Sequence, residues 1–196
     1  MQKSPARVLI ITGPIASGKS TLAQAVGRAI EARDATVAVV DLDLVYETLD
    51  LRGGRKRDDR RWEAARRGAA GLADGFVASG IDVVVVEGEF DGPARATFAN
   101  DLARTVDPLF VRLTVSYEEA LQRARADPTR GISRDPTFLW PYFQEYRRAA
   151  PHEAPTDLVL DTERLSVDRC VQAILGLLDG SEAPAHTPRH ITNSGL

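Results

Sequence analysis

Residues 13–20 read GPIASGKS and match the pattern G-x-x-x-x-G-K-[ST]. An apolar run at residues 7–12 precedes this segment, and apolar residues at helical spacing follow it from Lys19. In such a strand–loop–helix unit, successive backbone N–H groups of the loop surround phosphate oxygens, and the positive end of the helix adds to their attraction. The segment therefore predicts a nucleotide-binding phosphate loop.

The residue types of this loop each suit that chemistry. Gly13 and Gly18 permit backbone angles and close approaches that a side chain would hinder. Lys19 is expected to reach the outer phosphates and act in catalysis, and the Ser20 hydroxyl is expected to ligate Mg²⁺. We therefore predict ATP and Mg²⁺ as cofactors. The predicted nucleotide contacts of the loop are Gly13, Ala16, Ser17, Gly18, Lys19, Ser20 and Thr21.

Apolar strands alternate with helical segments about five times along the chain, which predicts a parallel sheet with helices on both faces. Ligands of such sheets bind beyond the carboxyl ends of the strands. Residues 1–180 are expected to form one domain, and residues 181–196 a flexible tail rich in Pro, His, Thr and Ser. The predicted strands are 7–12, 36–40, 81–86, 109–115 and 158–160. The predicted helices begin near residues 19, 60, 93, 117, 137 and 166.

The composition excludes several classes of protein. The chain has 196 residues, of which 43% are hydrophobic and 27% charged, as in globular domains. No run approaches the roughly 18 apolar residues of a membrane span, and the N-terminus lacks the apolar core of a secretion signal. The net charge of −3 argues against a dedicated nucleic-acid binder. A single cysteine, Cys170, cannot form an internal disulfide, so a reducing cytoplasm is the expected location.

Two carboxylates, Asp41 and Asp43, follow the second predicted strand. At the end of a strand, a period of two points both side chains to one side, where phosphates and a metal could lie. A carboxylate there can hold a Mg²⁺-bound water or take a proton from an attacking hydroxyl. Asp43 can instead cap a helix that begins at Leu44. The spacing leaves both interpretations open.

The loop, together with VAVVDLDLVYE at residues 37–47, resembles the small-molecule P-loop kinases. Shikimate kinases, adenylylsulfate kinases and chloramphenicol phosphotransferases belong to that group. The resemblance in layout covers most of residues 7–178 and implies a nucleoside-kinase-like α/β P-loop NTPase fold, with three α/β/α layers, a five-stranded parallel sheet and a short lid. It also implies that Asp43 faces the substrate hydroxyl as the base and that Asp41 assists the metal.

Arginines surround residues 127–136, DPTRGISRDP, where the resemblance implies a lid. Lid arginines close over the phosphates, exclude water and supply charge to the transition state. Arg123 and Arg130 have the separation of the arginines that pack on adenine and close the lid in shikimate kinases, and Arg134 is a second lid candidate. Arg164 lies in a segment like the one that borders adenine. A solvated basic loop is the alternative.

Three segments could line the pocket of the phosphate acceptor. Residues 51–62 include Arg55 and could bind an anionic substrate or form a solvated loop. Glu87 and Glu89 could be a metal-side acid or bind substrate hydroxyls or an amine, and a polar strand end is the alternative. Aromatic side chains at residues 138, 142 and 146 favour core packing through their helical spacing.

The leading hypothesis is an ATP-dependent kinase that acts on a hydroxyl of a small molecule, an antibiotic or a metabolite. The residues after the second and third predicted strands depart from the adenylylsulfate and shikimate kinase patterns, so neither specific activity is supported. One alternative is a polynucleotide or nucleotide kinase, in which residues 51–61 would track phosphates. Another is an ATP-binding switch without small-molecule transfer. No feature predicts the oligomeric state.

Overall fold

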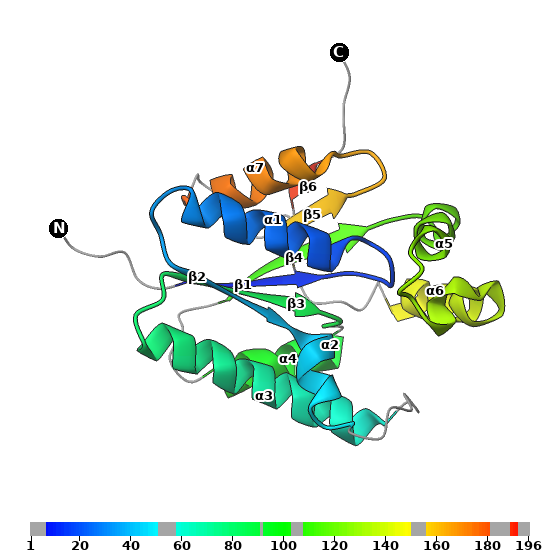
Figure 1. Ribbon diagram of the computed structural model, residues 1–196, viewed down its shortest axis with the longest axis horizontal. Helices are drawn as coiled ribbons and strands as arrows, with labels where there is room; N and C mark the ends of the chain where they lie inside the picture. Colours follow the sequence, from blue (N-terminus) through cyan, green and yellow to red (C-terminus); the bar gives the residue numbers. More distant parts are fainter. Residues whose placement is uncertain are drawn as a thin grey trace, which may run out of the picture.

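A parallel sheet of order β2-β3-β1-β4-β5-β6 forms the centre of the molecule (Figure 1). This computed structural model describes residues 7–50, 58–90, 92–102, 108–149, 156–180 and 189–191. The strands are β1 (Arg7–Thr12), β2 (Val37–Asp41), β3 (Val83–Gly88), β4 (Leu109–Thr114), β5 (Leu158–Asp161) and β6 (Arg189–Ile191). The helices are α1 (Lys19–Glu31), α2 (Leu42–Glu47), α3 (Asp59–Ala78), α4 (Gly92–Asp101), α5 (Tyr117–Ala126), α6 (Pro136–Ala149) and α7 (Val167–Leu178), with a 3₁₀ turn η1 (Ile132–Arg134).

β1 is buried on both faces, which explains its unbroken apolar sequence. Leu9 and Ile11 join a core cluster with α1 and α7, whereas Val8 and Ile10 join a second cluster with α2, α3 and α4. Figure 1 shows α1 and α7 over one face of the sheet and α3 and α4 over the other. The predicted three-layer α/β/α arrangement is therefore confirmed.

The five predicted strands are present, and β6 adds a sixth beside β5. Residues 189–191 lie within the segment expected to be a flexible tail, so that segment contains a strand which its composition did not predict. The remainder of the tail lies outside the described residues. Among the helices of the described part, none is both long and apolar enough to cross a membrane.

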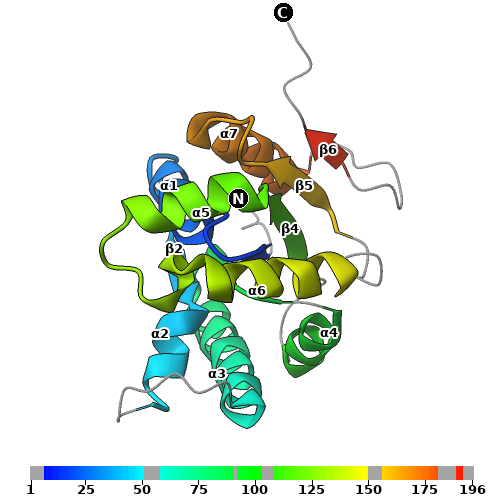
Figure 2. The ribbon, with the colours of Figure 1, turned by 90° about the vertical axis from the view of Figure 1, so that its right-hand side faces the viewer.

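α5 and α6 lie beyond the carboxyl ends of the strands, where Figures 1 and 2 both show them. They pack on each other and on the loop after β1 through an apolar cluster separate from the two core clusters. The buried members of this lid cluster are Ala16, Ala120, Ala124, Leu139 and Phe143. The fold thus packs the two helices that flank the segment expected to form the lid against the phosphate loop.

Candidate nucleotide and phosphoryl-transfer site

The loop between β1 and α1 has the tight backbone that its glycines predict. A Cβ atom on Gly13 would lie 2.7 Å from the Leu113 carbonyl oxygen and 2.9 Å from Ser17 Oγ, so only glycine fits there. Gly18, the residue before α1, has a φ of 91°, a left-handed conformation that glycine adopts readily. The loop therefore turns tightly into α1, so that its backbone and the N-terminus of the helix lie together, as phosphate binding requires.

Lys19 folds back over this loop. Its Nζ donates hydrogen bonds to the carbonyl oxygens of Gly13 and Pro14, both at 3.0 Å. The ammonium group is therefore held beside the first residues of the loop and can exchange these carbonyl oxygens for phosphate oxygens. Ser20 follows in the first turn of α1, where its hydroxyl bonds the Glu87 carboxylate.

The acid Glu87 contacts the start of α1 through a hydrogen bond with Ser20. It lies in β3, paired in register with Ile11 of β1 and Asp41 of β2, and is only 3% exposed. Burial raises the pKa of Glu87 to about 7, with a further contribution from Asp41, while Ser20 and Lys19 act in the opposite direction. Sequence reasoning left Glu87 open between a metal-side acid, a substrate-binding acid and a polar strand end. Its contacts favour the metal side.

Asp41 and Asp43 do not continue the strand as a pair. α2 begins at Leu42, so the expectation that a period of two points both side chains the same way is wrong. Asp41 is the helix cap, because its carboxylate accepts hydrogen bonds from the N–H groups of Asp43, at 2.8 Å, and Leu44, at 3.4 Å. The capping role considered for Asp43 thus belongs to Asp41. Asp43 lies exposed in the first turn of α2, at the carboxyl end of β2.

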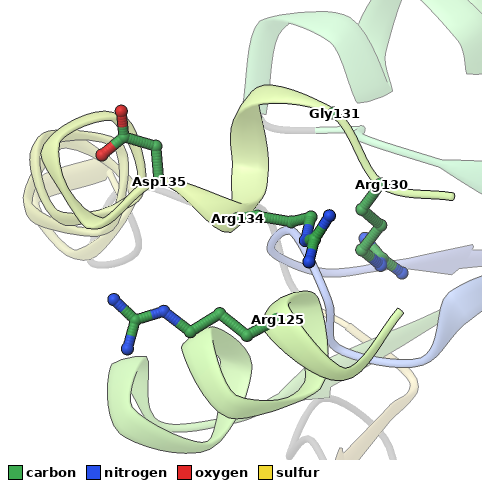
Figure 3. Close-up of a pocket in the computed structure, with 5 residues that line it drawn as sticks. All are labelled: Arg125, Arg130, Gly131, Arg134 and Asp135. Carbon is green, nitrogen blue, oxygen red and sulfur yellow. The ribbon is translucent and has the colours of Figure 1, made fainter. Parts of the chain in front are cut away.

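The arginines in and beside the segment expected to form the lid divide into two groups. Arg125, Arg130, Gly131, Arg134 and Asp135 line an open hollow of about 730 Å³. Figure 3 shows the side chains of Arg130 and Arg134 extending to the same side, whereas Arg125 extends the opposite way. Arg130 is held by an ion pair of 3.2 Å with Asp127 at the start of the lid. The geometry therefore groups the two predicted lid arginines and separates Arg125 from them.

Arg123 lies on α5 and contacts the loop after β5. Its guanidinium bonds Glu119 at 2.8 Å and both the hydroxyl and the carbonyl oxygen of Thr162, at 3.1 and 2.7 Å. The Thr162 hydroxyl in turn donates to the Ser17 carbonyl oxygen at 3.0 Å. Sequence reasoning gave Thr162 no individual role, although it directly follows a strand. Arg164, by contrast, is 67% exposed and pairs with Asp161.

The remaining candidates are those expected to line the acceptor pocket. Arg55 falls outside the described residues. Glu89, directly after β3, accepts a hydrogen bond from the hydroxyl of Tyr142 on α6. Of the three aromatic side chains expected to pack in the core, Tyr142 packs against the lid cluster, whereas Phe138 is exposed, so the prediction is wrong for Phe138. The helical spacing also gave no sign of the partners of the Tyr142 hydroxyl. Hydrogen-bond partners far apart in sequence leave no periodic signal, which is why this contact was missed.

The residues available for a divalent cation are one hydroxyl and two carboxylates: Ser20, Asp41 and Glu87. Hard oxygen donors of this kind suit Mg²⁺, which usually keeps several waters and takes only one or two carboxylates together with substrate phosphates. The orientation of the Ser20 hydroxyl toward a buried carboxylate fits such a cation. The described residues thus fit the predicted metal, with Glu87 added to the predicted Ser20 and Asp41.

A loop of this sequence after the first strand of a parallel α/β/α sheet defines the P-loop kinase fold. The chain belongs to the AAA domain family (AAA_33), whose pattern matches residues 8–137. It is similar to the shikimate kinase of Bacteroides thetaiotaomicron, with a TM-score of 0.65 and 18% identity over 88% of this chain and 98% of that chain. It is also similar to the APS kinase of Mycobacterium tuberculosis in complex with AMPPNP and APS, with a TM-score of 0.63 and 21% identity over 89% of this chain and 98% of that chain.

The pKa of Glu87 predicts how the stability of the unliganded protein changes with pH. Between pH 4.5 and about 7 the unfolded chain ionises Glu87 while the folded chain keeps it protonated. The unfolded state then binds fewer protons, so the free energy of unfolding falls as the pH rises, by roughly 2–3 kcal/mol for this group. Glu87→Gln is expected to remove this loss, and urea unfolding at pH 5 and pH 8 without Mg²⁺ or nucleotide measures it.

The matched control is Glu63→Gln, which changes an exposed glutamate of α3. It is expected to keep the pH dependence of the parent protein. An identical pH dependence in Glu87→Gln and the parent would contradict the burial of an ionisable Glu87 beside Ser20.

Proposed function

We propose that the protein is an ATP-dependent kinase that transfers the γ-phosphate to a hydroxyl of a small molecule, a metabolite or an antibiotic. The observation that carries this proposal is the convergence of Lys19, Ser20 and Glu87 at the carboxyl edge of the sheet. A buried carboxylate beside a lysine and a hydroxyl suits a magnesium nucleotide. The arginine lid beyond the same edge supports transfer, because transfer to an acceptor other than water requires that water be excluded.

The nucleotide is bound by the loop after β1 and by side chains that surround it. Backbone N–H groups of the loop after β1 surround the phosphates, and the Lys19 ammonium moves from its loop carbonyls to the outer phosphate oxygens. On the base side, Arg123 is fixed by Glu119 and Thr162, which leaves a flat guanidinium face for the adenine ring to stack on. Arg164, which lies exposed in the loop after β5, contacts the edge of the adenine ring.

The cation would be held by the Ser20 hydroxyl, with Asp41 and Glu87 behind it. When bound, Mg²⁺ would supply positive charge beside the phosphates and neutralise charge that develops on them during transfer. A nearby cation also favours the ionised form of Glu87, against the burial that keeps it protonated in the unliganded protein. Nucleotide binding is therefore expected to release a proton near neutral pH.

Asp43 orients the acceptor. Its carboxylate stands in the first turn of α2, exposed at the carboxyl end of β2. From there it can accept a hydrogen bond from an acceptor hydroxyl and take its proton as the oxygen attacks the γ-phosphorus. The bond between the γ-phosphorus and the bridging oxygen of ADP breaks, and ADP leaves with the electron pair.

Arg130 and Arg134 stabilise the transferring phosphoryl group after lid closure. Replacement of either by alanine is expected to lower kcat roughly 10²-fold, as loss of a preorganised donor does. Arg125→Ala is the control, because Arg125 lines the same hollow but extends the opposite way (Figure 3). Initial rates of ADP release measure all three variants. Equal losses in all three would contradict a specific role for Arg130 and Arg134.

The proposed function is tested by a screen of hydroxyl-bearing metabolites and antibiotics with the full chain, MgATP and a coupled ADP assay. We expect at least one compound to raise ADP release well above the rate with water alone and to gain one phosphate by mass spectrometry. MgATP binding without acceptor-dependent ADP release over a broad panel would instead support a nucleotide-binding switch.

A further inference from the structure

Tyr142 connects three parts of the site through one hydroxyl. It accepts a hydrogen bond from the N–H group of Ile15, inside the phosphate loop, at 3.2 Å. It donates a hydrogen bond to the carboxylate of Glu89, the residue after β3. Its own helix, α6, follows the lid directly. The Tyr142 side chain therefore connects α6, the phosphate loop and the Glu89 carboxylate, which is expected to lie on the acceptor side.

The hydroxyl is well suited to act as a fixed link. Burial, followed by the Glu89 carboxylate, raises the pKa of Tyr142, so the phenol remains protonated and donates to Glu89 throughout the neutral range. The ring stacks on Tyr146 and lies edge to face with Phe143, which holds its direction on α6. A tyrosine with both a packed ring and two hydroxyl partners has little freedom to move independently of its helix.

Apolar contacts join the same parts of the molecule. Ile15 and Ala16 of the phosphate loop pack in the lid cluster with Leu139 and Phe143 of α6. Pro141 precedes Tyr142 inside α6 and has no N–H group to donate to the Thr137 carbonyl. The first turn of α6, next to the lid, is therefore less firmly tied to the turn that holds Tyr142, and a bend between the two turns costs less than in an uninterrupted helix.

We propose that Tyr142 is a positioning residue that couples the phosphate loop to α6 and Glu89, so that filling of the loop by phosphates moves the lid helix and sets the carboxylate toward the acceptor. Phosphate binding draws the loop N–H groups inward, and Ile15 carries the Tyr142 hydroxyl with it. This inference rests on the proposed function only for its requirement that the loop binds a nucleotide.

Trp140 provides the reporter. It lies on α6, two residues before Tyr142, is 44% exposed, and packs edge to face against Tyr117 of α5, with ring centroids 4.8 Å apart. The other tryptophan of the chain, Trp62, stacks on Tyr46 and is removed by Trp62→Phe. In this background, movement of α6 relative to α5 changes the emission of Trp140 alone. The probes are MgADP and MgAMPPNP, followed by fluorescence and calorimetry on the full chain.

In the Trp62→Phe background we expect MgAMPPNP to change the Trp140 emission. Adding Tyr142→Phe is expected to abolish this change, while the affinity measured by calorimetry falls by less than about tenfold, because one neutral hydrogen bond is lost. Tyr117→Phe is the matched control, since it keeps a ring against Trp140, and it is expected to retain the response. Glu89→Ala, which removes the other partner of the hydroxyl, is expected to reduce the response and serves if Tyr142→Phe does not fold.

The outcomes separate the two proposals. Nucleotide binding with an unchanged Trp140 response in both Tyr142→Phe and Glu89→Ala overturns the coupling and leaves the proposed function standing. Binding without any Trp140 response in the background protein also overturns the coupling. Absence of nucleotide binding in the background protein overturns the proposed function, and the coupling with it.

Discussion

Lys19→Met is expected to lower the rate of phosphoryl transfer by roughly 10²–10³-fold, the loss that follows removal of a preorganised charge from a transition state. The ammonium is the cation that the structure holds at the phosphate loop, 3.0 Å from the carbonyl oxygens of Gly13 and Pro14. Methionine keeps most of the length of the side chain but supplies no charge. The measurement is the initial rate of ADP release with a saturating acceptor from the screen.

Two companion variants define the cause of that loss. Lys19→Arg is expected to recover little activity, because a planar guanidinium does not replace a compact ammonium in a closely fitted loop. Arg28→Met removes an exposed cation from the same helix and is expected to leave the rate unchanged. If Lys19→Met transfers phosphate at the rate of the parent, the phosphates do not bind at this lysine.

Asp43→Asn is expected to slow turnover roughly 10²–10⁴-fold, the range for loss of a general base, while MgATP still binds. The loss would be smaller if the transition state is nearly metaphosphate-like, because the acceptor then needs little deprotonation. Asparagine can still accept a hydrogen bond from the acceptor, but it cannot take the proton. Steady-state kcat and calorimetric affinity for MgAMPPNP measure the two effects separately.

Glu47→Gln supplies the control for Asp43→Asn, since it alters an acid one helical turn later on α2. It is expected to keep both kcat and nucleotide affinity. Full activity in Asp43→Asn would remove Asp43 from the mechanism and make Glu89, the partner of Tyr142, the next candidate for the base.

The fold could be read from the sequence because its signals are local. The apolar run of β1, the glycines at 13 and 18, and the switch to helical spacing at Lys19 each belong to one short segment. The outer strand β6 could not be predicted in this way. Three residues, Arg189–Ile191, are too few to show a period, and their place beside β5 depends on pairing across the sheet.

The site was less predictable because its contacts are long-range. From the sequence, the two acids after β2 could lie on an extended strand or at the start of a helix. The hydrogen bonds that Asp41 accepts from the N–H groups of Asp43 and Leu44 show that a helix begins there. The sequence also provided no reason to prefer Glu87 over Glu89, although β3 buries the first and leaves the second facing Tyr142. The burial of Glu87 and the hydrogen bond between Glu89 and Tyr142 depend on how strands and helices pack, which the local sequence does not specify.

The central claim is that the loop after β1 binds the triphosphate of a magnesium nucleotide. Titration calorimetry of the purified full chain with AMPPNP in the presence of Mg²⁺ tests it most directly. We expect saturable binding at one site per chain, with an affinity that falls when Mg²⁺ is removed and falls further in Lys19→Met. A folded protein that takes up neither AMPPNP nor its GTP counterpart with Mg²⁺ present would contradict it.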